Sequence, residues 1–211
     1  MPHSSAFERF RESFFGDPYM AWHDGLDTEA LHELGSDERA EAEAMLLHAI
    51  DSGDPRVMTG LGELRSDKAV AELTRRLPGA TGELQIALAV ALWKIAAYPP
   101  ALDYLIQNLR SRQFWSVRMD AAIALANLSG ASDAALRARA EQALVAALSD
   151  PEDLVRNHAA ESLLTLHARD PADPPYHDLC IAVMSDNRAH REAAVAALLA
   201  ALKQTEGPAS G

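Results

Sequence analysis

The sequence contains one cysteine, three lysines and no apolar run longer than ten residues. A single cysteine, Cys180, cannot form an intramolecular disulfide, which fits a reducing compartment. The longest apolar run, residues 193–202, is shorter than the ~18 residues that a membrane-spanning helix needs. The first fifteen residues lack the apolar stretch of a secretory signal. We therefore expect a soluble, cytoplasmic protein that makes no contact with a membrane.

The sequence also lacks the motifs of common nucleotide-binding and hydrolytic enzymes. It has no P-loop, no G-x-G-x-x-G motif after a strand and no G-x-S-x-G elbow. Three lysines and an isoelectric point of about 5.0 argue against a nucleic-acid-binding groove. We expect a protein that is not an enzyme and that binds neither a cofactor nor a nucleic acid.

Negative charge is concentrated near the start of the chain. Of the net charge of −12, residues 1–54 contribute −10, with thirteen acids against three arginines, and the other 157 residues contribute −2. For any single acid, solubility or a helix N-terminus is the commoner reason. A concentrated negative field, however, repels phosphate backbones and attracts basic partners. The asymmetry predicts a basic protein partner at this end of the chain.

One sequence pattern typical of a helix occurs three times, at residues 84–95, 117–128 and 155–166, and a weaker copy covers 189–200. Aligned on Leu92, Leu125 and Leu163, the copies are 33 and 38 residues apart. This period is typical of two-helix units stacked into a solenoid, because one pair cannot bury its apolar stripe alone. No stretch shows the alternation of a strand. The sequence predicts an all-α, right-handed superhelix of about five helix pairs, with these leucines buried.

Capping residues and helix breakers predict where the helices lie. Two early helices begin at Ser36 and, after the capping residue Asp54, at Pro55. The later predicted helices cover residues 68–77, 82–97, 101–109, 115–128, 133–148, 151–167, 175–184 and 188–203.

The first 35 residues do not repeat and contain four of the five phenylalanines. Phe7, Phe10 and Phe14 have helical spacing, so they share one face. They could form a cap over the open apolar end of a solenoid, or an aromatic patch that docks a partner. We predict an aromatic, acidic cap at 1–35, a solenoid at 36–204 and a disordered tail at 205–211.

Residues 149–156, with the sequence Ser-Asp-Pro-Glu-Asp-Leu-Val-Arg, resemble the HEAT repeat when taken with Ala159, Ala160 and Leu163. The resemblance is to the short variety of phycobilin-lyase-like proteins. It covers about residues 36–204 and is weakest before residue 66, where Gly60 and Gly62 interrupt the pattern. The resemblance implies an α-solenoid. It also implies an alternative function, a lyase or chaperone acting on a tetrapyrrole, whose pocket could be lined by Trp93, Trp115, Tyr98 and Tyr104.

Residues 22–31 and 34–47 resemble the leader of HEAT-like immunity proteins encoded beside bacterial polymorphic toxins. This resemblance implies an inhibitor that occludes a basic cognate toxin, and a general scaffold in a larger complex is a further alternative. The predicted partner-binding residues are Trp22, Asp24, Glu29, Glu33, Asp37 and Glu41.

Several polar groups could bind a metal, but each has a simpler explanation. The His-Asp pair at 23–24 and the His-Glu pair at 32–33 are similar to fragments of metal phosphohydrolases and of HEAT-type di-iron hydroxylases, which need several more ligands. A proline-rich loop carries four further candidates, but a turn with caps is the simpler reading. These candidates are His167, Asp170, Asp173 and His177. We expect no metal.

Two other interpretations concern Cys180 and a recurring arginine. Cys180 lies three residues after His177, which would suit a thiolate and imidazole pair, but its apolar neighbours favour a buried thiol. Arg118 and Arg156 could line a groove for an anion. More often such arginines pair with an acid of the same or the next repeat, and the acids within reach are Asp120, Asp150 and Asp153.

Overall fold

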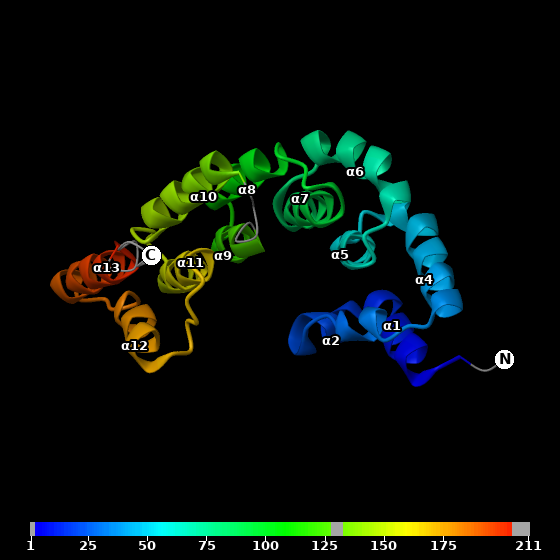
Figure 1. Ribbon diagram of the computed structural model, residues 1–211, viewed down its shortest axis with the longest axis horizontal. Helices are drawn as coiled ribbons and strands as arrows, with labels where there is room; N and C mark the ends of the chain where they lie inside the picture. Colours follow the sequence, from blue (N-terminus) through cyan, green and yellow to red (C-terminus); the bar gives the residue numbers. More distant parts are fainter. Residues whose placement is uncertain (1–2, 128–132, 204–211) are drawn as a thin grey trace, which may run out of the picture. The chain divides into compact units, whose positions relative to one another are not determined.

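The computed structural model describes residues 3–127 and 133–203, and within these ranges it contains thirteen α-helices and no strand. The predicted all-α class is confirmed. No helix in these ranges is long and apolar enough to span a membrane. The chain divides into two compact units, Met1–Ala101 and Leu102–Gly211 (Figure 1). This division differs from the predicted boundary at residue 35, and the tail at 205–211 lies outside the described residues.

The described residues of the first unit contain two layers of helices and an N-terminal group of three helices. Helices α4 and α6 lie in one layer and α5 and α7 in the other (Figure 1). Helix α5 packs against α7, and α4 and α6 each pack against the next α-helix along the chain. The helices are α1 (Ser5–Phe15), α2 (Pro18–Asp24), α3 (Glu29–His32), α4 (Ser36–His48), α5 (Pro55–Glu63), α6 (Val70–Arg76) and α7 (Gly82–Ala96).

Glycines in α5 explain why the repeat pattern is weak before residue 66. A Cβ at Gly62 would lie 2.9 Å from the Cα of Ala91 in α7. A Cβ at Gly60 would lie 2.9 Å from a methyl group of Leu46 and 2.9 Å from the ring of Phe14. These distances are shorter than real contacts, so a larger residue would push α5 away from its neighbours. The interruption of the sequence pattern is therefore a consequence of close helix packing.

The N-terminal phenylalanines belong to the core of the first unit. Helix α1 begins where the Ser4 hydroxyl accepts a hydrogen bond from the Phe7 amide at 3.2 Å. Phe7, Phe10 and Phe14 are 1%, 0% and 1% exposed, and α1 packs against α3, α4 and α5. These three rings are therefore not an exposed docking patch. That they cap the end of a solenoid stays a prediction.

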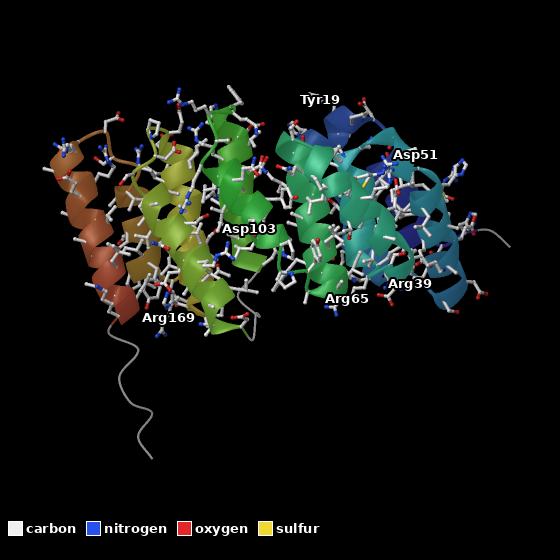
Figure 2. The ribbon with its side chains drawn as sticks, turned by 90° about the horizontal axis from the view of Figure 1, so that it is seen from above. Tyr19, Arg39, Asp51, Arg65, Asp103 and Arg169 are labelled. Atoms are coloured by element: carbon white, nitrogen blue, oxygen red, sulfur yellow. The ribbon has the colours of Figure 1, made fainter. Side chains whose placement is uncertain are left out.

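The second unit consists of six helices whose ends lie close to the predicted ones. They are α8 (Ala101–Leu109), α9 (Trp115–Leu125), α10 (Ala134–Ala147), α11 (Asp153–Leu166), α12 (Pro174–Ala182) and α13 (Arg188–Lys203). Helix α11 packs against α9, α10 and α12, and α12 packs against α13. Asp103 of α8 forms an ion pair with Arg139, which places α8 beside α10 (Figures 1 and 2). Helix α9 ends at Leu125, and residues 128–132 lie outside the described ranges.

The predicted burial of the repeated leucines is confirmed. Leu92, Leu125 and Leu163 are each 0% exposed. Leu198 of α13 is also 0% exposed, one residue after the equivalent position of the weaker copy. The residue seven positions before each leucine, two helical turns away, has a side chain that can donate hydrogen bonds. These donors are Gln85, Arg118, Arg156 and Arg191.

Each of these donors bonds to a backbone carbonyl in the segment that precedes its own helix. Nε2 of Gln85 donates to Leu77 O at 3.2 Å, and Nη1 of Arg118 to Gln113 O at 2.8 Å. Nη1 of Arg156 donates to the carbonyls of residues 150 and 151 at 2.8 and 2.9 Å, and Nη1 of Arg191 to that of residue 185 at 2.9 Å. These carbonyls lie at or beyond the ends of the preceding α-helices, where the α-helical hydrogen-bond pattern stops. The repeated donor thus closes the turn within each helix pair.

The pairing predicted for Arg118 is confirmed, but the one predicted for Arg156 is wrong. Arg118 forms an ion pair with Asp150, and this hydrogen bonding raises the pKa of its guanidinium. Arg156 is 3% exposed and also donates to Val183 O at 2.8 Å and Met184 O at 3.0 Å. The carbonyls at the end of α12 carry partial negative charge, so the cation is neutralised by backbone dipoles. An acid is not needed there.

Candidate functional site

The acids predicted to bind a partner are placed by α2, α3 and α4 of the first unit. Asp24 ends α2, Glu29 begins α3, Glu33 follows α3, and Asp37 and Glu41 lie one turn apart in α4. All five side chains are exposed. We call this set the acidic surface. The backbone of Trp22 belongs to α2, but its side chain lies outside the described residues.

Arg9 of α1 lies beside three acids of this surface, Asp24, Glu29 and Glu33. Its Nη2 donates to Glu33 Oε2 at 2.8 Å, and its Nε lies 3.4 Å from Asp27 Oδ2. The hydrogen bond to Glu33 raises the pKa of Arg9, and the charges of Asp27 and Glu29 raise it further. Arg9, Asp24 and Asp27 also line one hollow of about 190 Å³. The structure therefore gathers three acids around one arginine, with Asp24 on the lining of the same hollow, and leaves a negative excess.

The other two predicted acids lie along α4. Glu41 Oε2 is 3.1 Å from His3 Nε2, at the start of the chain. The Ser36 hydroxyl donates a hydrogen bond to Asp37 Oδ1 at 3.4 Å. In the part of the chain that the structure describes, neither Glu29 nor Asp37 forms an ion pair. These two carboxylates are therefore available to a cationic group of a partner.

Exposed apolar side chains lie beside the acidic surface, but they are not the predicted phenylalanines. Phe15, Tyr19 and Met20 are 38%, 60% and 51% exposed. Tyr19 lies at an outer edge of the first unit (Figure 2), and Met20 lines the same hollow as Arg9. Helix α2 starts at Pro18 and packs against α1, which turns these side chains outward. The sequence did not single out Met20 or Arg9, because their roles depend on how α1, α2 and α3 meet.

The candidate metal ligands do not gather in the described ranges. Within them, no group of three or more His, Cys, Asp or Glu side chains could hold a metal ion. His32 lies 3.4 Å from Glu63 Oε2, and His167 lies 3.3 Å from Glu141 Oε1. Asp170 accepts a hydrogen bond from the Ala172 amide at 2.9 Å, and Asp173 is the residue before α12. The segment 167–173 is thus a turn that leads into α12.

Cys180 is buried and holds its proton. It is 2% exposed, and burial, followed by the charge of Glu161, raises the pKa of its thiol to about 11. Glu161 itself lies in a hollow of about 530 Å³ that His177 also lines. Its two oxygens are 2.8 Å from His158 Nδ1 and 3.0 Å from Asn157 Nδ2. A protonated thiol is a poor nucleophile, so this group does not resemble an activated cysteine site.

The aromatic residues proposed for a tetrapyrrole pocket belong to different units. Trp93 and Tyr98 are half-buried in the first, and Tyr104 and Trp115 are half-buried in the second. The tetrapyrrole alternative stays a prediction without a specific contact in its favour.

The most developed polar site in the first unit is therefore the acidic surface around Arg9, with Tyr19 and Met20 beside it. It has the parts of a protein-binding surface, namely exposed carboxylates, two of which form no ion pair among the described residues, and exposed apolar side chains. Comparison of the chain with models of known families, with curated proteins and with solved structures finds no match.

Proposed function

We propose that this chain is a non-enzymatic protein-interaction module whose acidic surface binds a basic protein partner. The observation that carries the proposal is the cluster of Asp27, Glu29 and Glu33 around Arg9, with Asp24 on the lining of the same hollow. A clustered negative field steers a basic partner toward the surface, and exposed apolar side chains then slow its departure. The acidic surface supplies the negative field, and Tyr19 and Met20 supply the exposed apolar side chains.

We also propose that the helices form a right-handed α-solenoid of HEAT-like pairs. In the first unit α5 packs against α7, and in the second unit α9 packs against α11, so the second helices of neighbouring pairs are in contact. The repeated leucines and the repeated donors at 85, 118, 156 and 191 support one structural unit used several times. Such an architecture provides extended surfaces for binding other proteins.

The most concrete form of the proposal is an immunity protein that occludes a basic toxin domain. It is supported by the resemblance of residues 22–47 to the leaders of such proteins and by the exposed acids on the same segment. A scaffold in a larger complex would use the same surface. Identification of the bound partner distinguishes the two.

The test is to capture the partner from cells of the native host and to measure its binding kinetics at several salt concentrations. Glu29→Lys with Asp37→Lys reverses two carboxylates that form no ion pair among the described residues, so the fold is retained. We expect slower association and a weaker dependence on ionic strength. The matched control is Asp67→Lys with Glu83→Lys, two exposed acids of the same unit that lie outside the acidic surface and close to helix starts.

A second variant tests the apolar part of the site. Tyr19→Ala with Met20→Ala should speed dissociation, with a loss of about 2 kcal/mol in binding free energy. Ile181→Ala removes a comparably exposed apolar side chain from the second unit, outside both proposed sites, and should change nothing. An acidic partner, or equal effects of the test and control variants, would contradict the proposed site. Deleting residues 1–35 is not a useful test, because α1 contributes to the core.

A further inference from the structure

The second unit contains two adjoining hollows whose lining is basic although the chain is acidic. The first, of about 500 Å³, is lined by Arg110, Arg112 and Arg118 against one acid, Asp150. The second, also of about 500 Å³, is lined by two arginines, at 188 and 191, against one glutamate at 192. Ser149 lines both hollows, so they meet at this residue. Together they carry positive charge in a chain whose net charge is −12.

Two arginines of the first hollow are not committed to internal contacts. Arg118 is held by Asp150 and by the Gln113 carbonyl. Arg110 and Arg112 are exposed, and neither side chain forms an ion pair within residues 3–127 and 133–203. Eight of the sixteen arginines form an ion pair in these ranges. These two guanidinium groups are thus free to receive an external carboxylate, which they can bind with two parallel hydrogen bonds.

The hollow also offers apolar contacts. Its lining includes Leu109, Ala143, Ala147 and Pro151. Next to the two arginines along the chain, Phe114 is 68% exposed, with its ring centroid 5.4 Å from that of Trp115. An apolar surface of this kind contributes little to binding a bare anion but would contact the side chains of a peptide.

We propose that the two hollows form one docking groove for an acidic peptide segment of a partner protein. The carboxylates of the segment would bind Arg110 and Arg112, and an apolar side chain would cover Phe114. A peptide suits the groove better than a nucleic acid, because its apolar side chains can contact the exposed Pro151 and Phe114, which a phosphate backbone would not use. This groove is separate from the acidic surface of the first unit, and its sign of charge is opposite.

The test uses a displayed library of random peptides about twelve residues long, selected against the full chain. Selected peptides are then synthesised with a fluorescent label, and their binding is measured by fluorescence anisotropy. We expect one class of selected peptides to be rich in Asp and Glu and to contain a large apolar residue. Arg110→Gln with Arg112→Gln should weaken their binding about tenfold or more, as the loss of two charged contacts does.

Two further variants make the result specific. Arg137→Gln with Lys203→Gln removes the same charge from exposed positions outside the hollows, and it should change binding less than about twofold. Ala146→Phe fills the first hollow from an exposed position without changing the charge, and it should block the peptide.

The proposal is overturned if no acidic peptide is selected, or if the selected acidic peptides bind the Arg110 and Arg112 double variant as well as the unchanged protein. It is also overturned if a single-stranded oligonucleotide binds with the same sensitivity to these variants. Selection of basic peptides alone would support the acidic surface of the first unit and reject this groove, so the two proposals fail separately.

Discussion

Arg118 and Asp150 form a two-point ion pair, with Nε 2.8 Å from Oδ2 and Nη2 2.9 Å from Oδ1. Arg118 lies in α9 and Asp150 lies between α10 and α11, so the pair connects consecutive helix pairs of the second unit. The two side chains are only 12% and 10% exposed, which shields the pair from water and salt. This geometry gives the pair a structural role.

Arg118→Gln should therefore destabilise the protein by about 2 kcal/mol, because it leaves the Asp150 carboxylate poorly paired where water has little access. Urea unfolding followed by circular dichroism measures the change. Arg188→Gln is the matched control, since Arg188 and Glu192 form an exposed pair, and it should have no measurable effect. Equal stabilities of the two variants would show that the Arg118–Asp150 pair contributes no more to the free energy of unfolding than the exposed pair does.

Arg156→Lys should destabilise the second unit by about 3 kcal/mol although the charge is retained. A lysine ammonium cannot reach all four carbonyls that the guanidinium serves, so some stay buried without a donor. Hydrogen exchange at the end of α12 should rise more than in α7, which belongs to the other unit. A lysine variant as stable as the unchanged protein would mean that the carbonyl contacts are dispensable.

Gly62→Ala should destabilise the first unit by about 1–3 kcal/mol, although alanine is ordinarily the better helix former. The new Cβ would press on the backbone of α7 at Ala91, which cannot move as a side chain could. Gly79→Ala is the control, because a Cβ added at Gly79 would meet no atom within 4 Å, and it should not destabilise. Thermal unfolding of both variants compares them directly.

The Cys180 thiol should react slowly with a disulfide reagent in the folded protein and rapidly after unfolding in urea. Its pKa is raised to about 11 from an ordinary value of 9.0, so the folded state favours the protonated form. The resulting stabilisation is present below pH 9 and is lost as the pH rises from 9 to 11. Cys180→Ala should leave partner binding unchanged. Rapid labelling of the folded protein at neutral pH would contradict this picture.

The helices and the repeat could be predicted from the sequence because both depend on local spacing. Helix α8 and helix α13 have the predicted ends, since caps and breakers act within one or two turns. The burial of Leu125 and Leu163 followed from apolar periodicity, which marks one face of a helix whatever it packs against. The concentration of acids in residues 1–54 was likewise visible without a structure.

The sequence by itself thus determined that the chain is helical, that it repeats and where its negative charge lies. Only the tertiary structure decided that Arg156 binds carbonyls at the end of α12, that Phe10 is buried while Met20 is exposed, and that Arg9 collects three acids. It also decided that Arg110 lies beside a hollow formed with α10. The physical reason is that partners for a charge or a ring come from segments far away in the chain, and local periodicity does not specify which segments meet.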